Sequence, residues 1–76
     1  MSMYLYLVPS SLRNKRIEMG VSQAEIAEAL SVSRQTVIAI EKGRYLPSLP
    51  LAFRIARFFG TTVDEMFNPQ GQEARQ

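Results

Sequence analysis

Residues 22–41 have the sequence SQAEIAEALSVSRQTVIAIE, which carries the clearest structural signal in the chain. Its apolar residues recur at helical spacing on both sides of a short polar turn, which predicts helices over residues 23–30 and 34–42. Ser22 and Ser33 stand just before these helices, where a serine hydroxyl accepts a hydrogen bond from the first free N–H groups. We therefore expect two short helices joined by a tight turn, with hydrogen-bonding side chains exposed at the start of the second.

Three further helices are predicted by the same kind of signal. Acidic residues three positions after Ser22 and Thr62, Glu25 and Glu65, have the spacing of a capping box. Three glycines fall at predicted helix ends, where a left-handed residue closes the last turn. The additional helices and the residues that precede them are 12–19 after Ser10 or Ser11, 49–59 after Ser48, and 63–67 after Thr62; the glycines are Gly20, Gly43 and Gly60. These signals together predict an all-α, five-helix domain over residues 10–67.

Apolar positions on these helices predict the core. Arg16 lies on the apolar face of the first helix, and Ala27 is small where the second and third helices would cross. The expected core residues are Leu12, Met19, Ile26, Ala27, Leu30, Val37, Ile40, Leu49, Ala52, Ile55, Ala56 and Phe59.

Length and composition exclude several classes of protein. A chain of 76 residues with 46% apolar residues forms one small globular domain, a size that often gains stability by dimerising. The chain has no cysteine and no histidine, so we expect no disulfide, no thiolate or imidazole metal site, and no Cys or His nucleophile. Asp64 and Glu65 are adjacent acids in a helix first turn, which favours capping over acid–base catalysis. We therefore expect neither an enzyme nor a cofactor.

The sequence also indicates the cellular location of the protein. No apolar run approaches the roughly 18–20 residues of a membrane span, and the opening residues lack the charge and length of a signal peptide. Together with the absence of cysteine, this favours a cytoplasmic protein with no membrane partner.

Positive charge is concentrated in one part of the chain. Residues 34–57 hold five basic side chains and a single acid, Glu41, whereas residues 64–76 hold three acids and one arginine. The basic residues are Arg34, Lys42, Arg44, Arg54 and Arg57, the last two of which we interpret as a solvated face of the fourth helix. A local basic surface next to two short helices is typical of double-stranded DNA binding.

The motifs are specific enough to resemble a family. The chain resembles the Cro and phage-repressor type (XRE-like) of helix-turn-helix DNA-binding proteins, in particular small stand-alone members, and over residues 32–67 it is similar to the cytolysin-repressor type. The resemblance covers residues 12–67. It is carried by KRIEMGVSQAEIA at 15–27, VSRQTV at 32–37, IEKGRY at 40–45, Pro47–Leu49, Ile55–Ala56 and Asp64–Phe67.

The resemblance implies that the helix over residues 34–42 enters the major groove. Arg34 and Gln35 would then contact base edges, Gln23 would bond a phosphate, and Thr36 would reach a phosphate or a thymine methyl. Side chains just beyond the helix would hold the DNA backbone. The full set of implied DNA-binding residues is Gln23, Ser33, Arg34, Gln35, Thr36, Ile38, Lys42, Arg44 and Tyr45.

Relatives of this type pair the positions of Arg16 and Glu41, which implies a structural salt bridge between the first and third helices. Two residues depart from the family pattern. Ser31 stands where glycine is usual, so either it adopts a left-handed conformation or the turn differs. Ile38 stands where many relatives carry a polar base-contacting residue, and we expect it near a thymine methyl.

The ends of the chain are predicted to lie outside the domain. Residues 4–8 alternate aromatic and aliphatic side chains, typical of a short strand paired with the segment after the fifth helix or with a second subunit; an unstructured extension is the alternative. Residues 1–9 thus form an N-terminal extension and residues 68–76 a polar tail. The expected twofold dimer interface consists of Phe58, Val63, Met66 and Phe67.

The resulting hypothesis is a homodimeric transcriptional repressor that binds a pseudo-palindromic DNA site, with no small-molecule effector. Two alternatives stay open. An antitoxin or a restriction-modification controller uses the same DNA-binding fold, and a protein-interaction adaptor would have lost DNA affinity.

Overall fold

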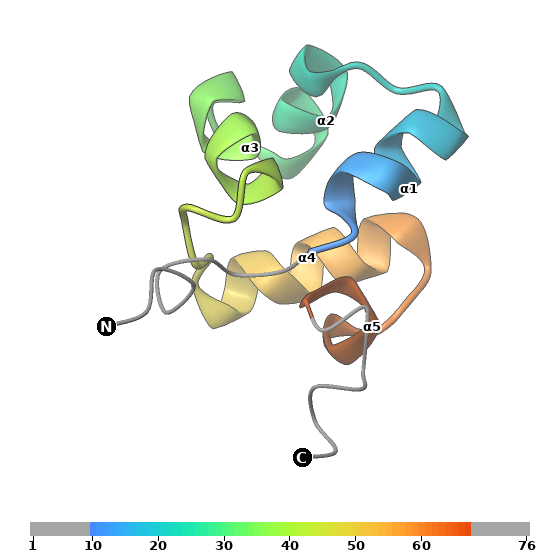
Figure 1. Cartoon of the computed structure of the whole chain (residues 1–76), viewed down its shortest axis with the longest axis vertical. Helices are drawn as coiled ribbons and strands as arrows, with labels where there is room; N and C mark the ends of the chain where they lie inside the picture. The colour runs from blue at the N-terminus through green and yellow to red at the C-terminus, as the bar shows by residue number, and fades with distance from the viewer. Residues whose placement is uncertain (1–9, 68–76) are drawn as a thin grey trace.

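The computed structural model describes residues 10–67 as an all-α domain (Figure 1). The helices agree with the predicted bounds, except that the third ends one residue early because Lys42 forms its C-cap. They are α1 (Leu12–Met19), α2 (Gln23–Leu30), α3 (Arg34–Glu41), α4 (Leu49–Phe59) and α5 (Val63–Phe67). The predicted strand at residues 4–8 and the predicted tail at residues 68–76 lie outside the described residues.

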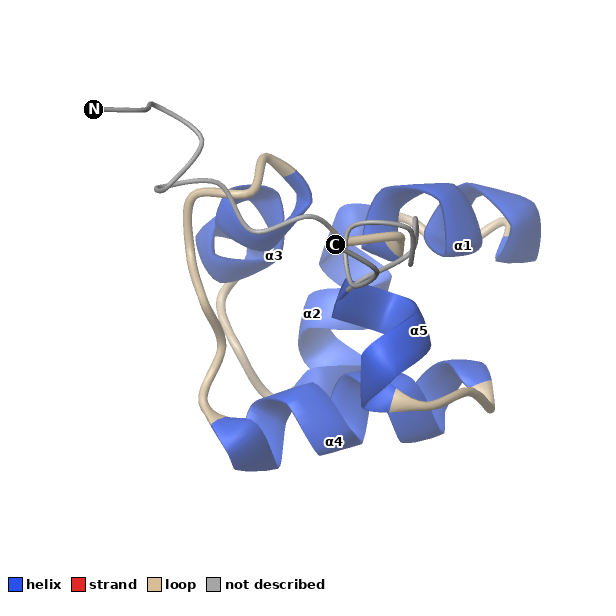
Figure 2. Ribbon diagram, turned by 60° about the horizontal axis from the view of Figure 1, so that its bottom comes forward, coloured by secondary structure: helices blue, strands red, loops and turns tan. Residues whose placement is uncertain are grey.

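The helices α2 and α3 pack against each other and form the predicted helix-turn-helix pair. In Figure 2, α4 runs along the base of the molecule, and α5 stands between α4 and the start of α1. The core lies where these helices meet, and its buried side chains are Leu12, Ile26, Ala27, Leu30, Val37, Ile40, Leu51, Ala52, Ile55, Ala56 and Met66. One face of the α2–α3 pair is thereby held against α1 and α4, and the start of α3 stays exposed.

The prediction of burial is wrong for two of the expected core residues, Met19 and Leu49. Met19 is 52% exposed because it lies in the last turn of α1, where it borders a shallow recess with Phe59 and is not covered by another helix. Leu49 is 64% exposed because it is the first residue of α4, and the buried side of that helix begins at Leu51. The buried stripe on α4 therefore starts two positions later than predicted, at Leu51, although Ala52, Ile55 and Ala56 remain in it.

Hydroxyl caps begin α2, α3 and α4 as predicted. In α2 the capping box is complete: Ser22 Oγ accepts from the N–H of Glu25 at 3.0 Å, and Glu25 Oε1 accepts from the N–H of Ser22 at 2.8 Å. The bond from the Ser22 N–H, and to a smaller extent the nearby Ser22 hydroxyl, lower the pKa of the Glu25 carboxyl below its ordinary value of 4.5, because they stabilise the carboxylate. Ser33 and Ser48 accept from the N–H groups three residues later, at 3.1 and 3.3 Å.

The hydrogen bonds at the starts of α1 and α5 differ from those that the sequence predicts. The N-cap of α1 is Ser11, but its side chain makes no capping bond, and the Ser10 hydroxyl accepts from the N–H of Leu12 at 3.3 Å instead. In α5, Thr62 accepts from the N–H of Glu65 at 3.2 Å, but the Glu65 carboxylate accepts from the hydroxyl of Thr61 at 2.8 Å. The predicted capping box at Glu65 is therefore only half formed.

The turn between α2 and α3 contains the one non-glycine residue with positive φ among the described residues. Ser31 has φ 60° and ψ 42°, so the first of the two alternatives for this turn is confirmed. The carbonyl of Leu30, one residue earlier, accepts from Arg54 Nη2 at 3.1 Å. Arg54 thus holds the end of α2 from α4, a role that the interpretation as a solvated face did not include.

Replacing Ser31 by glycine is expected to raise the free energy of unfolding by about 1 kcal/mol, because glycine adopts the left-handed conformation without the contact between Cβ and the backbone. The midpoint of urea denaturation measures this change at constant m value. Ala29→Gly, on the exposed side of α2, is the control and should lower stability by about 1 kcal/mol. A loss of stability in Ser31→Gly would show that the serine side chain stabilises this turn.

Candidate functional site

A partly buried ion pair joins α1 to the end of α3. Arg16 Nε donates to Glu41 Oε2 at 2.6 Å and Arg16 Nη2 donates to Oε1 at 3.3 Å. Arg16 Nη1 also donates to the carbonyl of Val21, at 3.0 Å. The Arg16 and Glu41 side chains are only 13% and 5% exposed, so water screens this pair weakly. The structure thus brings together the two residues that the sequence predicts as a salt bridge.

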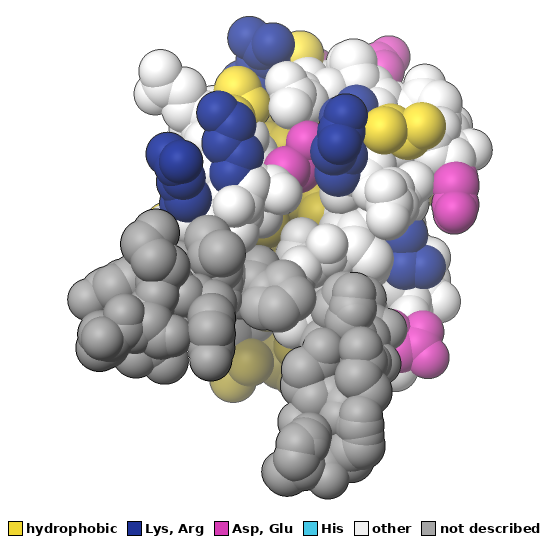
Figure 3. Space-filling model, in the orientation of Figure 1, with side chains coloured by type: hydrophobic (Ala, Val, Ile, Leu, Met, Phe, Trp, Pro, Cys, Tyr) yellow, Lys and Arg dark blue, Asp and Glu magenta, His cyan; other side chains and the backbone are white. Residues whose placement is uncertain are grey.

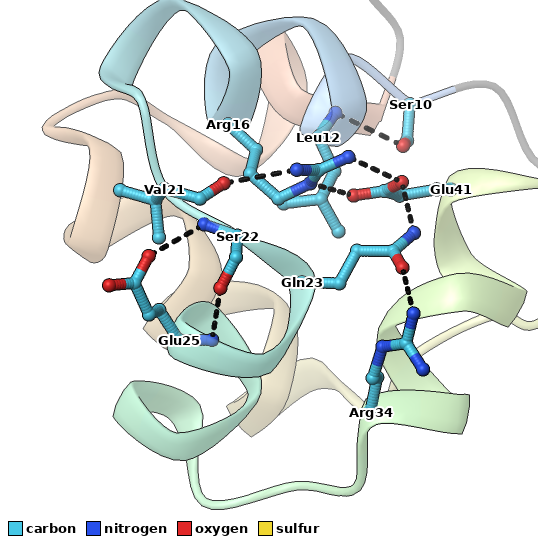
Figure 4. A network of polar contacts seen from close by, with 9 residues as sticks. All are labelled: Ser10, Leu12, Arg16, Val21, Ser22, Gln23, Glu25, Arg34 and Glu41. Atoms are coloured by element: carbon cyan, nitrogen blue, oxygen red, sulfur yellow. Dashed lines mark hydrogen bonds and ion pairs between the residues drawn. The ribbon is translucent and has the colours of Figure 1, made fainter.

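The ion pair continues into a chain of polar side chains that reaches the surface (Figure 4). Gln23 Nε2 donates to Glu41 Oε1 at 3.1 Å, and Gln23 Oε1 accepts from Arg34 Nη2 at 3.2 Å. Gln23 is the first residue of α2, and it thereby links both ends of α3, Glu41 at its last position and Arg34 at its first. The order Arg16–Glu41–Gln23–Arg34 connects the buried ion pair to an exposed arginine, a connection that the sequence analysis did not predict.

The other predicted DNA-binding residues surround the exposed start and end of α3. Gln35, Lys42, Arg44 and Tyr45 are exposed, whereas Thr36 and Ile38 are half-buried. The Thr36 hydroxyl lies 3.0 Å from the hydroxyl of Ser33, the cap of α3. Figure 3 shows Lys and Arg side chains gathered over the end of the molecule that α2 and α3 form. This end of the molecule therefore presents several positive charges and hydrogen-bond donors.

A recess of about 600 Å³ opens beside Arg34 on this face. Arg13 of α1 lines it and was not predicted, although its place three residues before Arg16 puts both arginines on neighbouring helix positions. The N–H groups of Gln23 and Ala24 begin α2 and have no carbonyl one turn earlier to receive them. The lining residues are Arg13, Arg16, Ser22, Gln23, Ala24 and Arg34. Arginine side chains at a helix start form a site suited to an anion.

The four residues predicted as a dimer interface differ in how far the structure exposes them. Phe58, Val63 and Phe67 are half-buried against the core and keep part of their surface exposed. Met66 is 0% exposed, because it faces inward from α5, so its prediction as a surface contact is wrong. More exposed apolar side chains, which the sequence analysis did not predict, lie around the start of α4: Leu46, Leu49 and Phe53.

Residues 10–67 contain neither a membrane-spanning helix nor a metal-binding cluster. Each of the five helices is too short to span a bilayer. Within the same residues, no three Asp or Glu side chains gather where they could hold a metal ion.

Comparison with known proteins gives consistent matches. A family model described as helix-turn-helix matches residues 12–66. An uncharacterized HTH-type transcriptional regulator of Methanocaldococcus jannaschii is 50% identical over 58 residues, covering 76% of this chain and 88% of the relative. A regulator of the same description from Methanothermobacter thermautotrophicus is 59% identical over 57 residues, covering 74% and 83%. The cryptic phage CTXphi transcriptional repressor RstR of Vibrio cholerae is 33% identical over 57 residues, covering 75% and 51%.

Proposed function

The chain belongs to the helix-turn-helix family of DNA-binding transcriptional regulators, which are not enzymes, and from this we propose that it is a homodimeric repressor of a pseudo-palindromic DNA site. The observation that carries the proposal is the exposed start of α3, where Arg34 and Gln35 stand beside an arginine-lined recess. A helix presented in this way enters the major groove with its first residues against the bases.

The two residues at the start of α3 have the chemistry to distinguish bases. Arg34 suits the O6 and N7 acceptors of guanine, and Gln35 suits the N6 donor and N7 acceptor of adenine. Ile38 lies one turn further along α3 and retains partly exposed apolar surface, which suits a thymine methyl. If this contact is made, the wild type should bind a thymine-containing site more tightly than the same site with uracil, and Ile38→Ala should bind the two sites equally.

Phosphate contacts on both sides of α3 would set its depth and register. On one side, the recess at the start of α2 offers Arg13, the N–H groups of Gln23 and Ala24, and the second Nε2 hydrogen of Gln23. On the other side, Lys42, Arg44 and Tyr45 follow α3 and are exposed, and Ser33 and Thr36 add hydroxyls at its start. A groove bounded by two phosphate backbones fits between these two sets.

A repressor role is supported by one relative, the phage transcriptional repressor RstR. A dimer that places two α3 helices about 34 Å apart would cover successive major grooves and block polymerase at a promoter. The protein would then associate with the chromosome.

The dimer interface proposed here uses the partly exposed apolar surface of Phe58, Val63 and Phe67 around α5. Sedimentation equilibrium should give a dimer for the wild type and a monomer for Val63→Asp. Phe53→Ser is the comparison variant because Phe53 exposes its ring at the start of α4. A monomer in Phe53→Ser together with a dimer in Val63→Asp would move the interface to α4.

The proposed function is tested by selecting bound sequences from random duplex DNA. We expect an inverted repeat whose half-sites are centred about one helical turn apart, or a multiple of a turn. Enrichment of a single half-site would contradict the dimer, and the absence of any enriched sequence would contradict sequence-specific regulation.

Lys42→Ala is expected to weaken binding to every DNA sequence by a similar factor, because a phosphate contact carries no base information. The slope of log K against log salt should become less steep by about 1 for each protomer, since one fewer counterion is released. Affinity is measured for the selected site and for a scrambled site between low and physiological salt. Lys15→Ala is the control and should leave the slope unchanged. Lys15 lies on α1 and borders the separate shallow recess next to Met19 and Phe59, not the arginine-lined recess. A changed base preference in Lys42→Ala would instead place this lysine against a base.

A further inference from the structure

We propose that Gln23 is a positioning residue that holds Arg34 for base recognition, and that Glu41 sets the orientation of the Gln23 amide. The proposal rests on the proposed function, because it assumes that Arg34 contacts a base. It assigns part of the DNA specificity to a side chain on α2 that does not itself read the base, and to the Glu41 carboxylate on α3, whose side chain is 5% exposed.

The orientation of the Gln23 amide follows from the chemistry of its two partners. The Glu41 carboxylate only accepts hydrogen bonds, so the Gln23 group facing it at 3.1 Å is the Nε2 donor. The Arg34 guanidinium only donates, so the group facing it at 3.2 Å is the Oε1 acceptor. A flipped amide would oppose two acceptors at one end and two donors at the other. The pair of partners therefore selects one orientation.

Glu41 is itself held in place. Its two carboxylate oxygens accept from Arg16 Nε and Nη2, and its side chain is only 5% exposed. A carboxylate that is fixed by a two-pronged guanidinium contact gives Gln23 an acceptor with a constant position. The fold, through the contact between α1 and α3, thereby orients a side chain at the start of α2.

The consequence for Arg34 is a restricted conformation before DNA arrives. An exposed arginine samples many rotamers, and a bound DNA site has to select one of them. The bond to Gln23 uses one of five guanidinium N–H donors, so enough donors remain for the two acceptors of a guanine. A side chain that is already restricted loses less conformational entropy on binding and discriminates more sharply between bases.

Gln35 provides an internal comparison. It is also exposed at the start of α3, but among residues 10–67 the bonds that link Arg16, Glu41, Gln23 and Arg34 do not include it. Base preference at the position read by Gln35 should therefore not depend on Gln23.

The test uses Gln23→Met, which keeps the length of the side chain and removes both hydrogen bonds. Binding of the full-length protein is measured to the selected site and to all single-base variants of it. Arg34→Ala and Gln35→Ala first identify the base pair that each residue reads. We expect Gln23→Met to reduce the preference at the Arg34 base pair about fivefold, the size expected for one lost hydrogen bond. The preference at the Gln35 base pair should stay unchanged, and Gln23→Met should have no further effect on preference when Arg34 is already alanine.

A second measurement is independent of DNA. In the free protein, the ¹⁵N order parameter of the Arg34 guanidinium should exceed that of Arg57, which is exposed on α4, and should fall to the Arg57 value in Gln23→Met. Circular dichroism melts establish that Gln23→Met is folded under the conditions used.

Two results would overturn the proposal. Gln23→Met could weaken all sequences equally and leave base preferences intact, which would make Gln23 a phosphate contact alone. Alternatively, the Arg34 guanidinium could be as mobile as that of Arg57 in the wild type. Both leave the proposed function intact, whereas an Arg34→Ala variant with unaltered base preference removes the base-reading role of Arg34 and this inference with it.

Discussion

Replacing Glu41 by alanine is expected to lower the free energy of unfolding by about 3–5 kcal/mol, the cost of removing one partner from a buried ion pair. Arg16 would keep its charge at 13% exposure without the carboxylate that receives its Nε and Nη2 donors. Gln23 would lose its acceptor in the same substitution. A loss of this size is a large share of the stability of a small domain, so the variant should be partly unfolded near room temperature.

Urea denaturation followed by circular dichroism measures the effect, with Glu28→Ala as the matched control. Glu28 is exposed on α2, and its removal should change stability by less than about 0.5 kcal/mol. The double variant Arg16→Met, Glu41→Leu should recover part of the loss, because no charge is then left without a partner. A loss of under 1 kcal/mol in Glu41→Ala would mean that water reaches the Arg16 guanidinium and solvates it.

Arg34→Ala is expected to abolish the preference for one base pair in each half-site of the selected DNA. A well-formed arginine–guanine contact discriminates by roughly 1–3 kcal/mol, and the proposed dimer would make the contact twice, so the selected site should lose about 2–6 kcal/mol. Binding to unrelated DNA should weaken much less, since only one positive charge for each protomer is removed. The variant should fold normally because Arg34 is exposed and its one bonded partner, Gln23, is also held by Glu41.

The measurement is competition between the selected site and the same site carrying each of the other three base pairs at the Arg34 position. Arg57→Ala is the matched control, because Arg57 is an exposed arginine on α4, away from the start of α3. Retention of full preference in Arg34→Ala would assign base recognition to other residues of α3. Equal weakening of all sites would make Arg34 a phosphate contact.

Local features of the fold could be predicted from the sequence because they depend on residues a few positions apart. A serine before each of α2, α3 and α4 accepts from an N–H three residues later, as its place in the sequence indicates. Left-handed glycines end α1 and α4 at the predicted positions. The helix bounds followed from these signals with an error of one residue, at Lys42.

Burial at the ends of helices could not be predicted in the same way. Met19 and Leu49 have apolar side chains and acceptable helical spacing, yet both are exposed, because no other element covers the last turn of α1 or the first turn of α4. Met66 shows the opposite error: it was expected on the surface, but α5 turns it inward, where the Ser11 hydroxyl lies 3.7 Å from its sulfur. Periodicity identifies a helix face, and the neighbouring elements decide how much of that face is covered.

The helices, the serine caps of α2, α3 and α4 and the family could be read from the sequence, and the family in turn implied the ion pair of Arg16 with Glu41 and the exposed place of Arg34. The contacts that join these residues became visible in the folded structure. Gln23 meets Glu41 and Arg34 from positions 18 and 11 residues away, Arg54 reaches the carbonyl of Leu30 from 24 residues away, and Arg13 lines the recess beside Arg34. Caps and helical periodicity depend on residues within a turn or two of each other in the sequence. A hydrogen bond between helices depends instead on how the whole core packs.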